Sequence, residues 1–471
     1  MSTISINLNN KVSKMKPMHG GGQPPLGGKD LIEYFHYMTE AGIPFSRLHD
    51  VWGSFGGGRF VDVPNLFRDF DADENDPASY DFTFTDKLLE GLVAAGTEPH
   101  FRLGVTIENA HMLKAYRIYP PKDFAKWARI CEHIVAHYVD GWADGFRFPI
   151  TYWEIWNEVD CCFKEETASM WKGTKEEYYL LYETASKHLK GVFGDRIKVG
   201  GYAACGFYEY KKDAELDGNV PEPTTMFEFC TVFLHGFLAH LRTTGAPLDF
   251  FSWHLYDRVL NGGIDFFEAV EHADYIRRVL DRYGFDKTES HLNEWNVYYY
   301  AKRRDDPRGA ARTLAFMLLM QNTPTDLMCY YDAGLGPSDY RAFINPDTLT
   351  PYRTYYAFPM FNSLYRLGDA VAVEGTDPRL IAGAAKKGSR ASIVIANMTG
   401  DDVWLELKAV GFAHNEVAIH RIDEENRYTL TNEPFGNLRI PEDGCVEITL
   451  YRLAEKQRGC LIKNSRKTKK K

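Results

Sequence analysis

The chain has 471 residues, of which 44% are hydrophobic, and a net charge of -10 at pH 7. An acidic chain with this much apolar sequence is expected to form a sizeable core and to lack the basic surface of a nucleic-acid-binding protein. No run reaches the ~18 apolar residues of a transmembrane helix, and the first ten residues lack the apolar centre of a secretion signal. The eight cysteines show no paired spacing, so we expect a reduced, cytoplasmic protein that binds no membrane.

Helix and strand patterns alternate along most of the chain. Residues 1–28 are irregular, with a possible short strand at 5–8 and a weak first barrel strand near 12–19. Apolar periodicity then predicts helices from residue 30 to Gly42 and over 86–95, 122–140, 176–192, 226–243, 266–283, 309–321 and 352–367. The predicted strands between them cover 45–49, 98–103, 150–156, 197–201, 248–254, 290–294 and 327–331. Eight such units predict a (β/α)8 TIM barrel over residues 29–367.

The residue pattern changes after residue 368, where the alternation of helices and strands stops. Short alternating runs at 380–384, 391–396, 403–407, 417–421 and 446–450 are separated by turn residues. This spacing predicts a C-terminal antiparallel β-sandwich domain over 368–455. Residues 1–28 form an N-terminal segment in this scheme, and its short strand could join the sandwich. The lysine-rich end, residues 456–471, reads as a solvated, disordered tail.

Polar side chains cluster at the ends of the apolar strands. In a barrel, the carboxyl ends of the strands form the catalytic face. The residues expected there are His19, Arg47, His49, Arg102, Asn157, Glu158, His254, Tyr256, Glu294, Tyr331 and Asp332. Glu158 ends the fourth strand and Glu294 ends the seventh, so we expect the two carboxylates to face each other across the barrel mouth.

Two facing carboxylates are what glycosidic bond hydrolysis requires. At a separation of ~5–5.5 Å, one acts as acid/base and the other as nucleophile. Arg47 and Tyr256 are the donors expected near Glu294, which would keep that carboxyl ionised. We therefore expect Glu294 to be the nucleophile and Glu158 the acid/base, with Asn157 donating to the sugar 2-hydroxyl.

Further side chains are expected to bind substrate. They are His254, His49 and the aromatic residues Trp52, Trp295 and Tyr331, whose rings could stack on sugars. No metal or cofactor is expected. His133 and His137 stand four apart on a predicted helix, but the glutamate of a zinc protease does not lie between them.

These motifs resemble those of clan A glycoside hydrolases, and of family 39 in particular, the β-xylosidase and α-L-iduronidase family. The stretch 154–160 resembles the family's acid/base strand, with Val159 where proline is usual. The stretch 293–296 resembles its nucleophile strand, with Asn293 where threonine is usual. His254 and Tyr256 match its His-x-Tyr, and Arg47 and His49 match its Arg-x-His. The resemblance covers residues 30–455 and implies the same roles for Glu158 and Glu294.

We therefore predict a retaining, metal-independent exo-glycosidase of the β-xylosidase type, acting on oligosaccharides. Another clan A specificity is an alternative: α-L-iduronidase, with Arg102 as partner of a uronic acid, arabinosidase or β-glucosidase. A carbohydrate-binding pseudo-enzyme on the same fold is a second alternative. The resemblance also implies a possible homo-oligomer. One sequence does not identify the sugar.

Overall fold

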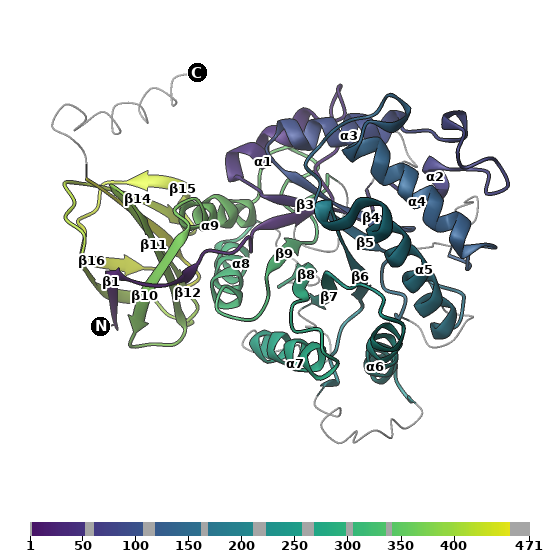
Figure 1. Ribbon diagram of the computed structural model, residues 1–471. Helices are drawn as coiled ribbons and strands as arrows, with labels where there is room; N and C mark the ends of the chain where they lie inside the picture. The colour runs from purple at the N-terminus through teal and green to yellow at the C-terminus, as the bar shows by residue number, and fades with distance from the viewer. Residues whose placement is uncertain are drawn as a thin grey trace. The chain divides into compact units, whose positions relative to one another are not determined.

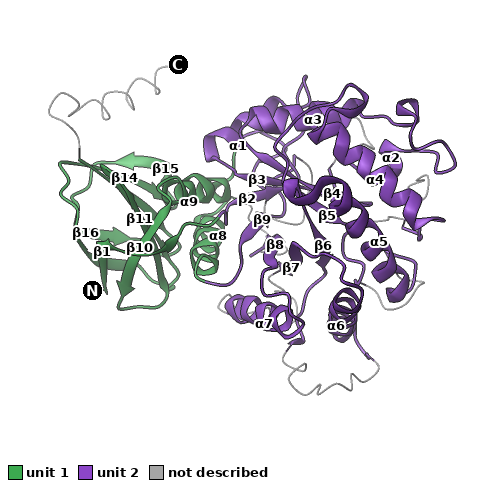
Figure 2. Ribbon diagram, in the orientation of Figure 1, with its two compact units in different colours: residues 1–16, 302–322, 351–471 green, residues 17–301, 323–350 purple. Residues whose placement is uncertain are grey.

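The computed structural model describes residues 2–51, 61–106, 118–161, 168–210, 223–256, 268–297, 305–335 and 342–452. They form two compact units, shown in separate colours in Figure 2. The barrel unit comprises residues 17–301 and 323–350. The sheet unit comprises residues 1–16, 302–322 and 351–471. Trp52, Cys162 and the basic tail fall outside the described residues.

The barrel unit is built on a closed barrel of parallel strands that pair in chain order, which confirms the predicted fold class (Figure 1). The strands are β2 (Gly20–Gly22), β3 (Phe45–Leu48), β4 (Glu98–Leu103), β5 (Tyr152–Ile155), β6 (Lys198–Ala204), β7 (Phe250–Tyr256), β8 (Glu289–Asn296) and β9 (Leu327–Tyr330). Glu158 therefore follows the fourth barrel strand, and Glu294 lies on the seventh.

Helices connect these strands, and each buries one face. They are α1 (His36–Ala41), α2 (Val63–Leu66), α3 (Thr83–Ala94), α4 (Phe124–Val139), α5 (Lys175–Phe193), α6 (Met226–Thr244) and α7 (Glu268–Arg282). In α4, the buried stripe includes Trp127, Ile130 and Ile134, as its periodicity predicts. The cap of α5 is a capping box between Thr174 and Glu177, which satisfies amide groups that the first helical turn leaves without partners.

The first barrel strand differs from the prediction. It is Gly20–Gly22, and residues 12–14 instead end β1 (Ser2–Lys14) in the sheet unit. His19 thus precedes the strand, and its Nε2 lies 3.1 Å from the Gly42 carbonyl oxygen, away from the strand's carboxyl end. Glycines carry no side-chain pattern, so periodicity does not find this strand. A Cβ at Gly20 would lie 2.5 Å from the Met328 carbonyl oxygen, which explains why glycine is needed there.

The sheet unit holds a single nine-stranded sheet, ordered β15-β14-β17-β12-β11-β10-β1-β13-β16. Neighbours are antiparallel except β1 and β13, which run parallel. The further strands are β10 (Asp369–Gly375), β11 (Leu380–Lys387), β12 (Arg390–Asn397), β13 (Val403–Val410), β14 (Glu416–Ile422), β15 (Arg427–Thr431), β16 (Asn437–Ile440) and β17 (Cys445–Tyr451). Side chains from β1, β10 to β14, β16 and β17 pack into one hydrophobic core.

Two helices belong to the sheet unit, although residues up to 367 were expected in the barrel. They are α8 (Pro307–Met320) and α9 (Ala357–Tyr365), which follows the short 3-10 turn η8 (Arg353–Tyr356). A Cβ at Gly383 of β11 would come within 2.7 Å of Leu318 and 3.2 Å of Leu364, which shows how closely these helices pack on the sheet. Among the residues that the structure describes, none of the helices is long and apolar enough to cross a membrane.

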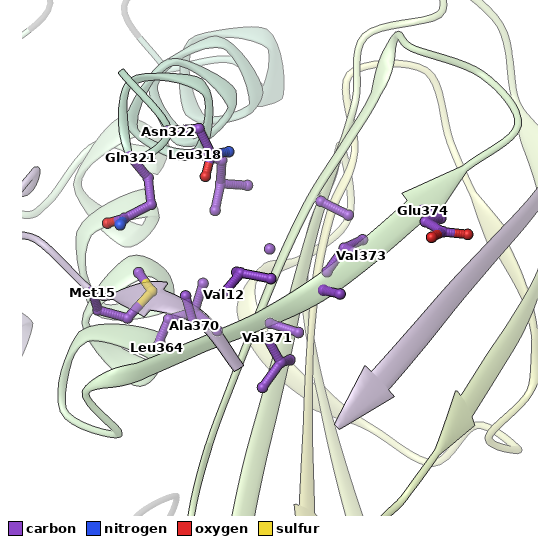
Figure 3. A pocket seen from close by; sticks show the side chains of 14 residues that line it. Val12, Met15, Leu318, Gln321, Asn322, Leu364, Ala370, Val371, Val373 and Glu374 are labelled. Carbon is purple, nitrogen blue, oxygen red and sulfur yellow. The ribbon is translucent and has the colours of Figure 1, made fainter. Parts of the chain in front are cut away.

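The sheet unit contains a cavity of about 360 Å³ beside β10 and β11 (Figure 3). Its walls are mainly aliphatic, with Val12, Leu318 and Leu364 among them. Gln321 at its edge already bonds the Lys16 amide and the Lys14 carbonyl oxygen. This cavity lacks the facing carboxylates of the predicted site, which belong to the barrel unit.

Candidate active site

The chain turns sharply where Glu158 leaves β5. Trp156 has φ 72° and Glu158 has φ 43°, values that are uncommon for residues other than glycine. Hydrogen bonds hold the turn: the Trp156 amide donates to the Leu103 carbonyl oxygen (2.8 Å), and the Glu158 amide to that of Ala203 (3.0 Å). Such backbone conformations persist where the surroundings fix them, as at functional sites. Here they set the direction in which the Glu158 side chain leaves the strand.

A β-bulge in β8 sets the direction of the Glu294 side chain, across the barrel from β5 and Glu158. Along β7 and β8, Trp253 pairs with Leu292 but the next residue, His254, pairs with Glu294, so Asn293 is the extra residue. Regular strands point successive side chains to opposite faces, whereas a bulge re-aims them. Asn293 and Glu294 are neighbours in the chain, yet both contact side chains from facing barrel strands.

Arg47 of β3 connects the polar groups of the barrel mouth. Its side chain is 2% exposed. Nε donates to Glu154 (2.8 Å), Nη1 to Glu294 (2.8 Å) and Nη2 to the Asn157 side-chain oxygen (2.5 Å). The pKa of the Glu154 carboxyl is lowered to about 2, because the attraction of Arg47, with hydrogen bonds, outweighs the effect of burial. Glu154 is therefore a fixed negative charge.

Glu294 is held by donors on both carboxylate oxygens. Arg47 donates to Oε2, and the Tyr256 hydroxyl donates to Oε1. Burial raises the pKa of Glu294, and the charge of Glu158 adds to this, while His254, Arg47 and Tyr256 oppose the rise. These donors favour the ionised form of Glu294, the form that a nucleophile needs.

Glu158 lies in a different environment. One carboxyl oxygen is 2.6 Å from Nδ1 of His254, and no arginine or tyrosine donates to it among the described residues. Burial raises its pKa to about 7, and Arg47 opposes this only in part. Burial also lowers the pKa of His254 to about 4, so the ring is neutral at pH 7. Glu158 is thus suited to carry a proton near neutral pH.

The two carboxylates meet at His254. Its Nδ1 lies 2.6 Å from Glu158 and 3.7 Å from Glu294, and one oxygen of each carboxylate lies within 4.8 Å of the other. These three side chains together offer ligand atoms of the kind that bind a metal ion. Glu294, however, already accepts hydrogen bonds from Arg47 and Tyr256, an arrangement that suits a catalytic carboxylate better than a metal ligand.

A second polar group lies at the ends of β2, β3 and β9. The Tyr331 hydroxyl accepts from the Gln23 side chain (2.8 Å) and donates to Asp50 (3.2 Å). His49 lies 3.5 Å from the other oxygen of Asp50. The Tyr331 ring is 6.3 Å from that of Tyr256, so this group adjoins the donor of Glu294.

Three other residues that were predicted to bind substrate are not found in these polar groups. Trp295 is fully buried and packs edge-on against Tyr330, a core position for a residue expected to stack on a sugar. Arg102 is also fully buried and donates to Asp62 (2.6 Å), so its charge is matched within the protein rather than kept for a uronic acid. Trp52 lies outside the described residues.

Sequence reasoning missed the supporting residues Glu154, Gln23 and Asp50. Glu154 could have been predicted, because an acidic residue in a buried strand needs a charged or hydrogen-bonding partner. Gln23 and Asp50 gave none, because they lie in irregular segments next to strand ends. The contact of Asn293 with Glu154 depends on the bulge in β8, and no residue pattern in the sequence predicts that bulge.

Comparison with known proteins identifies the family. A model of the glycosyl hydrolases family 39 matches residues 57–332, more than half of the chain. The chain belongs to this family. It is a glycoside hydrolase, and its substrate is a carbohydrate.

Two β-xylosidases and several solved structures match most of the chain. A β-xylosidase of Geobacillus stearothermophilus is 22% identical over 81% of this chain and 74% of its own length. One of Caldicellulosiruptor saccharolyticus is 27% identical over 82% of this chain and 77% of its own. Among solved structures, a glucosidase from Croceicoccus marinus has a TM-score of 0.78 at 21% identity, covering 96% of this chain and 100% of its own. A monomeric β-xylosidase from Caulobacter crescentus CB15 has a TM-score of 0.68 at 16% identity, with the same coverage. At these identities the structures show a shared fold.

Proposed function

We propose that this family 39 enzyme is a retaining exo-glycosidase of the β-xylosidase type, with Glu294 as nucleophile and Glu158 as acid/base. The main support is the unequal environment of the two glutamates. Glu294 accepts from Arg47 and Tyr256, whereas Glu158 faces a neutral histidine. Where the surroundings keep one carboxyl group ionised and the other protonated, the first can act as base or nucleophile and the second as acid.

In the first step, the Glu294 carboxylate attacks the anomeric carbon while Glu158 protonates the departing glycosidic oxygen. The bond from sugar to leaving group breaks, and an ester between the sugar and Glu294 forms. In the second step, Glu158, now ionised, takes a proton from water, and the resulting hydroxide displaces Glu294 from the sugar. One oxygen of each carboxylate lies within 4.8 Å of the other, which supports this retaining geometry over the wider inverting one.

Asn157 is the proposed donor to the sugar 2-hydroxyl. Because Arg47 donates to the side-chain oxygen of Asn157, the amide is oriented with its amino group turned away from the guanidinium. That group can donate to a hydroxyl beside the anomeric carbon. A hydrogen bond there strengthens in the transition state and so accelerates the reaction.

The β-xylosidase assignment rests on the two curated relatives, which match along most of the chain. The ion pair of Arg102 with Asp62 weakens the alternative of a uronic acid substrate. A panel of nitrophenyl glycosides, with β-xyloside, β-glucoside, α-L-arabinoside and α-L-iduronide arms, tests the choice. We expect the β-xyloside to have the highest kcat/KM, and a higher value for another arm would replace this assignment.

Removal of each glutamate tests the roles separately. We expect Glu294→Ala to lower kcat by several orders of magnitude on every substrate, because no covalent intermediate forms. Glu158→Ala should retain the first step on aryl glycosides with good leaving groups, and azide should restore its turnover by replacing the activated water. The control is Glu406→Ala, a partly exposed glutamate of β13 in the sheet unit, which should leave activity unchanged.

Trapping identifies the nucleophile directly. A 2-fluoro glycoside of the preferred sugar should label the enzyme, and peptide mass spectrometry should find the label on Glu294. A label on another residue, or full activity of Glu294→Ala, would contradict the mechanism.

A further inference from the structure

We propose that Asp160 is a positioning residue for Glu158: its side chain replaces a backbone acceptor between β5 and β6 and so holds the turn that carries Glu158. The inference deepens the proposed function and rests on it, since it assumes that Glu158 is the acid/base. It is carried by the hydrogen bonds that join this turn to β6 and α6.

The regular pairing of β5 with β6 ends before Glu158. The last paired residues are Glu154 and Gly200, and β5 itself ends at Ile155. In a parallel pair of strands, a residue donates its amide to one residue of the neighbouring strand, and its carbonyl oxygen accepts from the residue two positions further along. Beyond the last pair, the position of Glu158 depends on individual contacts.

One half of the parallel pattern continues at Glu158. Its amide donates to the Ala203 carbonyl oxygen (3.0 Å), so the regular partner of its own carbonyl oxygen would be the Cys205 amide. The Glu158 carbonyl oxygen instead accepts from the Cys161 amide (3.1 Å), because Glu158 has a φ of 43° and the chain turns there. The Cys205 amide therefore needs another acceptor.

Asp160 provides that acceptor with its side chain. The residue is fully buried, and its Oδ1 accepts from the Cys205 amide (3.0 Å). Its carbonyl oxygen accepts from the Cys230 thiol of α6 (3.4 Å). The turn after β5 is thus attached to β6 through two groups, the amide of Glu158 and the carboxyl group of Asp160, and to α6 through a third.

The attachment to β6 also places Glu158 relative to His254. Ala204, at the end of β6, pairs with Trp253 of β7. The next residue of β7 is His254, whose Nδ1 lies 2.6 Å from a Glu158 oxygen. A turn that moved relative to β6 would change this contact and the position of the acid at the glycosidic oxygen. Displacement of a catalytic group by about 1 Å can lower a rate by about 100-fold.

The contact with Cys205 does not require a charge on Asp160. Burial raises the pKa of Asp160 to about 7, although the hydrogen bond from the Cys205 amide opposes the rise. A protonated carboxyl group still has an oxygen that accepts, and Oδ2 of Asp160 has no hydrogen-bond partner in the described part of the chain. Asparagine should therefore hold the turn through its amide oxygen. Leucine has a similar shape but offers no acceptor.

The dependence of kcat/KM on the leaving group tests the proposal, because this ratio reports the steps up to cleavage of the glycosidic bond. A phenyl glycoside of the preferred sugar needs a proton from the acid, whereas a dinitrophenyl glycoside loses its leaving group without one. We expect Asp160→Leu to lose about 100-fold on the phenyl glycoside and much less on the dinitrophenyl glycoside. An equal loss on both substrates, or no loss on either, would overturn the proposal.

Asp160→Asn separates the acceptor from the charge. We expect this variant to stay close to the wild type on both substrates, since its amide oxygen can accept from the Cys205 amide. A loss as large as that of Asp160→Leu would contradict the positioning role. If Asp160→Leu does not fold, Asp160→Ala takes its place, and the proposal fails if alanine and asparagine behave alike.

Asp326→Leu is the matched control. Asp326 precedes β9 at the amino ends of the strands, and its Oδ2 accepts from the Ser290 amide of β8 (2.8 Å). The variant thus loses the same kind of contact at the end of the barrel opposite the carboxyl ends of the strands. It should show no difference between the two leaving groups. A difference equal to that of Asp160→Leu would mean that any such loss produces it, and the proposal would fail.

Glu158→Ala in the same assay separates this inference from the proposed function. If Glu158 is the acid, that variant itself loses far more on the phenyl glycoside than on the dinitrophenyl glycoside. This contrast in Glu158→Ala without one in Asp160→Leu would overturn the positioning role alone. Equal losses of Glu158→Ala on both substrates would overturn the proposed role of Glu158, and the inference with it.

Discussion

At the scale of single residues, the arrangement of the site depends on how the buried guanidinium group of Arg47 distributes its hydrogen bonds. Arg47 donates to Glu154, Glu294 and Asn157 with three different nitrogens. A lysine has one nitrogen and no planar fork, so it could not hold these three acceptors in fixed directions. Arg47 therefore orients the proposed nucleophile, Glu294, and the proposed sugar donor, Asn157, together, and Glu154 compensates the remaining charge.

Tyr256→Phe should weaken the proposed nucleophile, Glu294, without displacing it. The variant loses the hydroxyl that donates to Glu294, and this donor favours the ionised carboxylate. A hydrogen bond to a charged group contributes about 1.5–3 kcal/mol, so we expect kcat/KM to fall by about 10- to 100-fold. The pKa of Glu294 should rise, which moves the acidic limb of the pH profile to higher pH.

The control for this experiment is Tyr179→Phe, which removes a buried hydroxyl that donates to the Phe233 carbonyl oxygen. It should leave the acidic limb in place. If the limb of Tyr256→Phe also stayed in place, the hydroxyl would not govern the ionisation of Glu294.

Residue patterns could locate the two glutamates but not their detailed surroundings. Glu158 and Glu294 follow apolar strands at recognisable positions, and barrel topology brings strand ends together. The sequence does not show that His254 contacts Glu158, because that distance depends on a bulge in β8 and a left-handed residue after β5. Burial of Trp295 was equally hidden, since an aromatic side chain suits a core and a sugar platform alike.

At the scale of elements, the periodicity of apolar side chains correctly located helices and strands whose residues have side chains. The predicted helix at 176–192 is α5 (Lys175–Phe193), and the predicted strand at 98–103 is β4 (Glu98–Leu103). The failure at β2 has a physical cause: three glycines have no inward or outward side chains. Their strand is defined instead by how closely its backbone approaches β9.

Gly20→Ala should therefore destabilise the barrel unit. The new methyl group would lie 2.5 Å from the Met328 carbonyl oxygen, a backbone atom that cannot move without disturbing β9. Overpacking of this kind costs about 1–3 kcal/mol, which should appear as a lower midpoint in thermal unfolding.

Gly191→Ala provides the matched comparison. This glycine lies in α5, has nothing within 4 Å of an added Cβ, and is not in a left-handed conformation. Alanine there should stabilise the fold by about 0.4–1 kcal/mol. Equal unfolding midpoints for Gly20→Ala and wild type would mean that β2 tolerates a side chain.

At the scale of the whole molecule, the sheet unit depends on pairing between the two ends of the sequence. β1 (Ser2–Lys14) lies between β10 and β13, antiparallel to the first and parallel to the second. Its residues Ile4, Ile6 and Leu8 enter the common core. Without this strand, β13 and β16 would be separated from the other strands of the sheet.

Ile6→Ala tests whether this long-range pairing stabilises the unit. Ile6 is 1% exposed, and truncation of a buried isoleucine to alanine costs about 2–5 kcal/mol through lost burial and a residual cavity. Ser5→Ala, on the exposed face of the same strand, should change stability by less than about 0.5 kcal/mol. Chemical denaturation of both variants, monitored by the protection of sheet-unit amides from hydrogen exchange, measures the difference. If Ile6→Ala and Ser5→Ala were equally stable, β1 would be an accessory edge of the sheet rather than the strand that joins its two parts.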